Sequence, residues 1–170
     1  MSIDATSISR LSKAVLVAAV AAWSLLVAFN NVFDYASNFQ FVRHVLEMDT
    51  TFPGNAGMWR AIHAPILQHA AYALIIATEF AVGVLAGLGA IGMARAHSDV
   101  TLFRRARSLS IAGLALGILL WLLGFEVIAG EWFLMWQSRS WNAEGSAFRF
   151  VVVLSAILIF ISLDDRADAG

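Results

Sequence analysis

Four long apolar stretches, separated by more polar segments, constrain the fold of this chain more than any other feature of its sequence. They cover residues about 14–32, 70–94, 109–133 and 147–163. A helix needs about 20 mostly apolar residues to cross the hydrocarbon core of a bilayer. The sequence therefore predicts an all-α, polytopic membrane protein, a bundle of four transmembrane helices that forms one domain over residues 1–170.

The composition agrees with a membrane-embedded chain and excludes several kinds of chemistry. Charged residues make up 14% and hydrophobic residues 60% of the sequence, whereas a soluble domain carries about 25% charged residues. The chain has no cysteine, which excludes disulfides, iron–sulfur clusters and thiolate zinc sites. The 11 basic residues nearly balance the 12 acidic ones, so the sequence indicates the lipid bilayer, and not a nucleic acid, as the partner.

The first apolar stretch has two interpretations. It follows Arg10 and Lys13, as the apolar region of a signal peptide follows its basic residues. However, it is long for such a region and leads directly into Asn30, Asn31 and Asp34, without a cleavage pattern of small residues. We therefore expect a transmembrane helix here.

The basic residues predict the orientation in the membrane. One side of the predicted topology holds Arg10, Lys13, Arg95, Arg104, Arg105, Arg107 and Arg166. The other side holds Arg43, Arg60, Arg139 and Arg149. Because cytoplasmic loops carry the excess of Lys and Arg, we expect both termini in the cytoplasm and two outer loops, at about 34–64 and 134–146.

The first outer loop contains an amphipathic segment. Its apolar residues Phe39, Val42, Val45 and Leu46 recur at helical spacing. This pattern predicts a short helix that lies on the outer membrane surface or caps the bundle. The segment 49–55 that follows contains Pro and Gly and is predicted to form turns.

Small residues mark the faces on which the helices are expected to pack. In the third stretch Gly113, Gly117 and Gly124 project within about 40° of one another at 100° per residue, and Glu131 projects onto the same face. In the second stretch the corresponding face combines His69, Tyr72, Ile76, Glu79, Gly83, Gly87 and Ala90. Small residues let helices approach closely in a membrane, and we favour this packing role over a gating role.

A layer of polar residues is predicted in the outer third of the membrane. Its members are Asn30, Asn31, Glu79, Glu126 and Arg149. A rise of 1.5 Å per residue places these residues roughly 21–26 Å from the cytoplasmic ends of their helices. Ionisable groups at such depth are costly unless they are paired or hydrated, so Glu79 or Glu126 is expected to pair with Arg149.

The sequence leaves open what this polar layer does. It is either a structural contact that fixes helix register, or a protonatable or ligand-binding site. Further candidates at the outer interface are Asp34, His69, Glu131, Trp132 and Trp136.

The histidines do not indicate a cofactor or a metal. A bis-histidine haem needs two histidines at one depth, and only His69 lies near a predicted span. His63 and His69 are six residues apart, a spacing that does not favour a zinc pair on one helix. The sequence also lacks the common hydrolase, nucleotide-binding and zinc-protease motifs, so we predict no catalytic residues, no cofactor and no metal.

Two groups of segments resemble a known family. The first comprises 29–35 (FNNVFDY), 38–39 (NF), 42–46 (VRHVL) and 48–53 (MDTTFP), and the second 130–138 (GEWFLMWQS) and 141–142 (WN). They resemble a bacterial family of predicted small integral membrane proteins of about this length. The resemblance implies a four-span protein of the bacterial inner membrane, and it implies no substrate, cofactor or catalytic residue.

Three functional hypotheses follow. The leading one is a non-enzymatic accessory or structural membrane component that works as a homo-oligomer or within a larger membrane complex. The second is a small proton-coupled transporter that uses Glu79, Glu126 and Arg149. The third is a quinone-linked redox subunit that works at the outer interface through His69, Glu131 and the nearby tryptophans.

Overall fold

The computed structural model describes residues 5–164, and these residues form helices and connecting turns without a β-strand. The α-helices of this part are α1 (Ala5–Phe33), α2 (Tyr35–Glu47), α3 (Pro65–Arg95), α4 (Val100–Leu119) and α5 (Glu144–Ser162). Helix α4 continues directly into a π-helical segment, η2 (Leu120–Trp132). Two short 3-10 helices, η1 (Ala56–Arg60) and η3 (Met135–Gln137), lie in the outer loops.

Four of the described helical segments are long and apolar enough to cross a membrane. They are Thr6–Phe33, Pro65–Arg95, Val100–Trp132 and Glu144–Ser162. The predicted all-α class, with four helices that are candidates for membrane spans, is therefore confirmed. The helices of the first three spans begin well before the apolar stretches, because polar residues such as Arg10 continue the helix beyond the apolar part.

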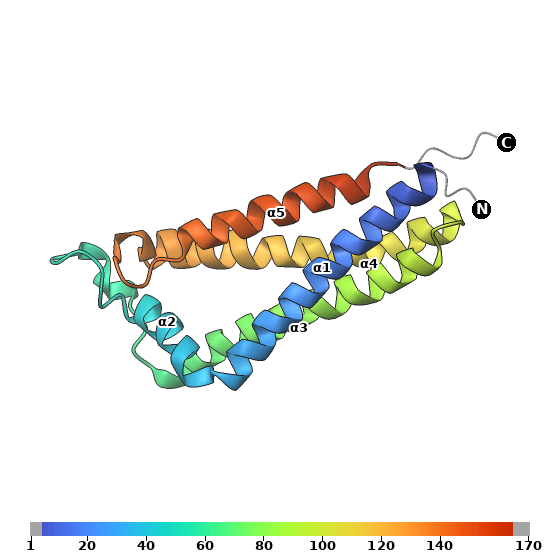
Figure 1. Cartoon of the computed structure of the whole chain (residues 1–170). Helices are drawn as coiled ribbons and strands as arrows, with labels where there is room; N and C mark the ends of the chain where they lie inside the picture. Colours follow the sequence, from blue (N-terminus) through green and yellow to red (C-terminus); the bar gives the residue numbers. More distant parts are fainter. Residues whose placement is uncertain (1–4, 165–170) are drawn as a thin grey trace.

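The helices converge at one end of the molecule and separate at the other. Figure 1 shows that α1 begins, α5 ends and α3 turns into α4 at the same end. Toward the other end, the α1–α3 pair separates from η2 and α5, and α2 lies between the two pairs (Figure 1). Asn30, Asn31 and Glu126 belong to the parts of α1 and η2 toward this end, whereas Glu79 lies near the middle of α3.

Small residues allow the close packing of the convergent half. A Cβ atom on Gly89 would lie 2.7 Å from the backbone nitrogen of Ser110, and one on Gly113 would lie 2.9 Å from that of Ala86. A Cβ atom on Gly117 would lie 3.0 Å from a side-chain carbon of Leu154 on α5, so this contact is with a side chain and not with a backbone. The prediction that these glycines permit close helix contact is confirmed at Gly113 and Gly117.

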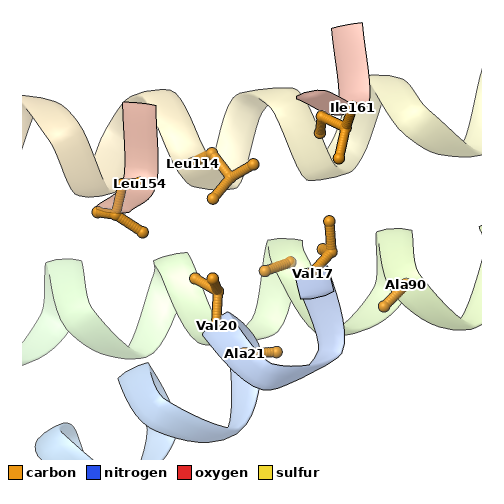
Figure 2. Packing of buried hydrophobic residues seen from close by; sticks show 8 residues of the cluster. Val17, Val20, Ala21, Ala90, Leu114, Leu154 and Ile161 are labelled. Carbon is orange, nitrogen blue, oxygen red and sulfur yellow. The ribbon is translucent and has the colours of Figure 1, made fainter. Parts of the chain in front are cut away.

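Between these contacts, medium-sized apolar side chains fill the centre of the bundle. Figure 2 shows Val17 and Val20 of α1 pointing toward Leu114 of α4 and Ile161 of α5. Leu154 of α5 completes this buried cluster. Because lipid tails are as apolar as these residues, their packing stabilises the bundle through van der Waals contact and not through removal from water.

The π-helical segment corrects part of the predicted wheel. In η2 hydrogen bonds span five residues, as in the bond of 3.0 Å from the Phe133 backbone nitrogen to the Ile128 carbonyl. A wheel of 100° per residue therefore fails after Leu120. The prediction that Gly124 and Glu131 share the Gly113 face is wrong, since Glu131 is exposed and a Cβ on Gly124 would meet only the Leu120 side chain, at 3.7 Å.

Helix α2 confirms the predicted amphipathic segment and caps the bundle. Its buried residues are the predicted Phe39, Val42, Val45 and Leu46. They form one cluster with Tyr72 of α3 and with Phe133 and Met135, which follow η2. The helix ends at Glu47, and its C-cap residue Met48 has a left-handed φ of 55°. The predicted turns follow, with Gly54 at a φ of 77°.

Enlarging Gly89 tests the close α3–α4 contact. We expect Gly89→Ala to destabilise the protein by about 1–3 kcal/mol, because the backbone of Ser110 cannot move away as a flexible side chain could. The matched control Gly124→Ala has room for its methyl group and is expected to leave stability unchanged or slightly raised. Thermal unfolding in detergent, followed by circular dichroism, measures both, and equal midpoints for the two variants would contradict the packing analysis.

Candidate functional site

The structure brings together two residues of the predicted polar layer, Asn31 and Glu79. The Asn31 amide nitrogen on α1 donates a hydrogen bond of 2.7 Å to a carboxylate oxygen of Glu79 on α3. The hydroxyl of Tyr72, two turns before Glu79 on α3, donates to the backbone carbonyl of Asn31 at 3.0 Å. Glu79 is only 3% exposed and Tyr72 only 2%. These contacts join α1 to α3 inside the membrane-spanning part of the bundle.

The space beside Glu79 is very small. A crevice of about 20 Å³ lies between Glu79 and side chains of α1, η2 and α5, among them Ser24, Trp121 and Phe150. Trp121 and Phe150 stack with ring centroids 4.0 Å apart and close the crevice on one side. A cavity needs roughly 10–15 Å³ to hold one water molecule. The crevice therefore has room for about one water molecule.

Arg149 does not pair with either carboxylate, so the predicted ion pair is wrong. Its guanidinium is exposed and donates to the hydroxyl of Ser146 at 3.1 Å. The reason is rotational. Helix α5 packs through Ala147, Leu154 and Ile161, which are buried at a spacing of seven residues. Arg149 follows Ala147 by two residues, or about 200° around the helix, and so points away from the bundle.

Asn30 and Glu126 also lie outside the Asn31–Glu79 contact. The Asn30 side chain is exposed, and its backbone carbonyl accepts a bond of 2.9 Å from the Asp34 nitrogen. One carboxylate oxygen of Glu126 is buried and has no hydrogen-bond partner among the described residues. The structure thus divides the predicted polar layer into one interhelical contact and three separate residues.

The five candidates at the outer interface do not form a single site. The Nδ1 of His69 lies 2.8 Å from the Tyr35 hydroxyl, and its ring stacks on Phe39 at 4.1 Å. Asp34 is the exposed residue between α1 and α2, and Glu131 is exposed on η2. Trp132 and Trp136 contact different rings, those of Trp59 and Phe52 respectively. Among residues 5–164, no three His, Asp or Glu side chains are placed to hold a metal ion.

Hydrogen bonds that sequence reasoning missed connect the two outer loops. The Thr50 hydroxyl donates to the Ser138 hydroxyl at 2.8 Å, and the Phe52 backbone nitrogen donates to the Gln137 side chain at 3.0 Å. These partners are more than 80 residues apart. The sequence gives no periodic pattern from which these hydrogen-bonded pairs could be predicted, because both loops are irregular. The second outer loop thus holds the segment that follows α2.

A further contact fixes the end of α2 to the start of α3. The buried Gln68 donates to the Glu47 carboxylate at 3.1 Å and to the Ile62 carbonyl at 2.8 Å. Partial burial raises the pKa of Glu47, but hydrogen bonds from Arg43 and Gln68 outweigh it and hold that pKa below its usual value. Glu47 is therefore ionised at neutral pH. Together, α2, the two outer loops and the start of α3 form what we call the outer cap (residues 35–68 and 133–143).

Basic side chains close the opposite end of the bundle. The Lys13 ammonium donates to the Leu163 carbonyl at 2.6 Å, and Arg107 donates to the Ile161 carbonyl at 3.0 Å. Arg10 donates to the His97 carbonyl at 3.0 Å. Cations at the carboxyl end of a helix satisfy its last carbonyls and oppose its dipole. The residues that predict orientation therefore also cap helix ends. Arg166, the remaining basic residue of this side, lies outside the described residues.

Comparison with known proteins gives the family. Residues 9–164 match the family described as predicted small integral membrane protein (DUF2165). The chain belongs to this family. No curated protein and no solved structure matches the chain. The resemblance found in the sequence is confirmed, and the protein is a small integral membrane protein embedded in a lipid bilayer.

A double-mutant cycle tests whether Asn31 and Glu79 act as a pair. We expect Asn31→Leu and Glu79→Leu each to destabilise the protein, and the two together to be less than additive by about 0.6 kcal/mol, the average for interhelical hydrogen bonds, and by no more than about 1.7 kcal/mol. Glu79→Gln keeps an acceptor for Asn31 and is expected to stay close to wild type. Detergent-denaturation midpoints measure all variants.

The neighbouring Asn30 provides the control for this cycle. Because its side chain is exposed, Asn30→Leu is expected to cause no loss of stability. Strict additivity of the Asn31 and Glu79 substitutions, or an equal loss for Asn30→Leu, would contradict the proposed coupling.

Proposed function

We propose that this protein is a non-enzymatic accessory or structural component of a bacterial inner membrane, in which Asn31 and Glu79 form a structural contact. The observation that carries this proposal is the crevice of about 20 Å³ beside Glu79. A pathway or binding site for a substrate needs far more room, since small-molecule pockets measure about 300–1,000 Å³. A carboxylate that is held by an amide and surrounded by packed rings suits a contact that fixes helix register.

The two other hypotheses receive less support from the positions of their residues. The transporter hypothesis requires Glu79, Glu126 and Arg149 to share one site, but Arg149 is exposed and bonded to Ser146. The redox hypothesis relies on His69 and Glu131. The His69 ring is already hydrogen-bonded to the Tyr35 hydroxyl and stacked on the Phe39 ring. Neither set of residues surrounds a common cavity in the described part of the chain.

The proposal includes an orientation with both termini in the cytoplasm. It is supported by six described basic residues at the end where α1 begins and α3 turns into α4: Arg10, Lys13, Arg95, Arg104, Arg105 and Arg107. The outer cap and the start of α5 carry four, Arg43, Arg60, Arg139 and Arg149. The excess of Lys and Arg favours the cytoplasm for the first end.

Fusion reporters test this orientation in bacterial cells. We expect green fluorescent protein fused to the C-terminus to fluoresce and alkaline phosphatase fused there to be inactive, because phosphatase folds only outside the cytoplasm. Insertion of the phosphatase at Gly54, an exposed turn of the outer cap, is expected to give the active enzyme. Active phosphatase at the C-terminus would reverse the proposed orientation.

The proposal also includes association with further membrane proteins or with copies of this chain. The glycine faces do not provide the contact, because Gly83, Gly89, Gly113 and Gly117 already pack inside the bundle. The outer cap instead exposes large aromatic side chains, such as Phe52 at 54% and Trp136 at 44%. The loops that carry them are held together by hydrogen bonds, which favours them as a contact surface of fixed shape.

Native mass spectrometry after extraction in mild detergent tests the association. We expect masses that correspond to more than one copy of the 18.4 kDa chain, or to the chain with other polypeptides. A double variant, Phe52→Ser with Trp136→Ser, is expected to lower the proportion of these species. Isolation of the single chain alone, in every mild detergent tried, would argue against an accessory component.

A further inference from the structure

An apolar groove lies between α2, α3 and η2. It has a volume of about 340 Å³ and is lined from α2 by Val42, Val45 and Leu46, and from α3 by Ala71 and Ile75. We call it the α2 groove. Its volume lies at the lower end of the range of ligand pockets. The groove is formed by the same face of α2 that the sequence predicts as apolar.

The α2 groove opens toward the surrounding lipid. Residues on its rim are well exposed, with Leu74 at 68% and Leu123 at 50%. The polar side chain that lines it, that of Thr78, donates to the Leu74 carbonyl at 2.8 Å and so offers no free hydroxyl hydrogen. An apolar groove of this kind does not hold ordered water. Its neighbours in the membrane are acyl chains.

A cationic group, Arg60, is connected to two residues that line the groove: it contacts Trp132, the neighbour of Phe133, and it lies two residues before Ile62, whose backbone nitrogen donates to the Leu46 carbonyl at 2.8 Å. The guanidinium carbon of Arg60 lies 5.3 Å from the ring centre of Trp132 and 5.9 Å from that of Trp59. Trp132 immediately precedes Phe133, which lines the α2 groove. The Nε of Arg60 donates to the Gly57 carbonyl at 3.3 Å, and no carboxylate of the described residues forms an ion pair with Arg60.

This combination has the chemistry of a phospholipid site. Arginine presents planar paired donors that match a phosphate, and tryptophans take positions at the headgroup level of a membrane. The two aromatic rings hold the guanidinium beside the groove through cation–π contacts. The positive group and the apolar groove then lie in the same order as the phosphate and the acyl chain of a lipid.

We propose that the protein binds one membrane phospholipid, with the phosphate at Arg60 and one acyl chain in the α2 groove. The proposal is independent of the accessory role, because it concerns the membrane-facing side of α2 and not the Asn31–Glu79 contact. It assigns a ligand to the amphipathic helix: α2 forms one wall of a lipid site in addition to capping the bundle.

Titration of the delipidated, full-length protein with dioleoyl phosphatidylglycerol tests the proposal. Native mass spectrometry is expected to show one retained lipid per chain. Arg60→Gln is expected to weaken binding about tenfold, as loss of a charge-assisted hydrogen bond does, and Arg60→Lys by less. Arg139→Gln, an exposed arginine in the second outer loop, is the matched control and is expected to leave binding unchanged.

Variants that fill the α2 groove provide a second test of the proposal. Ala71→Trp is expected to abolish lipid retention, whereas Ala70→Trp, at an exposed position of the same helix that lines neither the α2 groove nor the apolar groove between α1 and α3, is expected to preserve it. Gly124→Leu fills the groove from η2 and replaces Ala71→Trp if thermal unfolding shows that the latter does not fold. Dioleoylglycerol, which lacks the phosphate, is expected to bind at least tenfold more weakly than the phospholipid.

The other outcomes overturn the assignment. Wild-type lipid binding by both Arg60→Gln and the folded groove variant would exclude the site. If only the groove variant loses lipid binding, and dioleoylglycerol binds as tightly as the phospholipid, the groove binds an apolar ligand without recognising a headgroup. Displacement of the lipid by millimolar inorganic phosphate would indicate an anion site, and retention of a polypeptide in place of lipid would indicate a protein partner.

Discussion

The close approach of α3 to its neighbours at small residues determines how the rest of the molecule is built. In a bilayer, apolar surface gains nothing by leaving lipid for protein, so helices associate where their backbones come near enough for dense van der Waals contact. Gly89 and Gly113 bring α3 and α4 to that distance in the convergent half. The other half contains large rings instead, including Trp121 stacked on Phe150. Helices held close at one end and separated by rings at the other must diverge, as Figure 1 shows.

The divergence explains the presence of α2. A space between two helix pairs must be filled by protein or by lipid, and a helix with one apolar face can occupy most of it while its other face meets water and headgroups. Helix α2 packs this face against Tyr72 and Phe133. The outer loops then fix its end through the bonds of Thr50 with Ser138 and of Gln68 with Glu47. The α2 groove is the part of the space that α2 leaves unfilled.

Features that repeat along the chain could be predicted from the sequence, and features that depend on a single rotation or a distant partner could not. The length of the apolar stretches predicted the four candidate spans, and the helical spacing of apolar residues predicted all four buried residues of α2. The prediction that Glu131 lies on the Gly113 face was wrong, because the hydrogen bonding changes from α- to π-helical after Leu119 and alters the rotation per residue. The sequence composition does not indicate this change. The predicted ion pair of Arg149 was wrong for a different reason. Depth alone was used to place it, whereas the spacing of Ala147, Leu154 and Ile161 already indicates that it faces away from the bundle.

The polar groups of the outer half differ in where their partners come from. Asn31, Glu79 and Tyr72 lie among packed helices, and each is hydrogen-bonded to another of the three. A buried polar group without a partner is costly in a medium that offers no water, so partners within the protein stabilise these three residues, whereas one buried carboxylate oxygen of Glu126 has no partner among the described residues. Arg60 lies in the outer cap beside two exposed tryptophans that also contact each other. At this level water and lipid phosphates are available, so the fold does not need to supply a carboxylate. A guanidinium that the protein positions but does not neutralise leaves the membrane to provide its counterion.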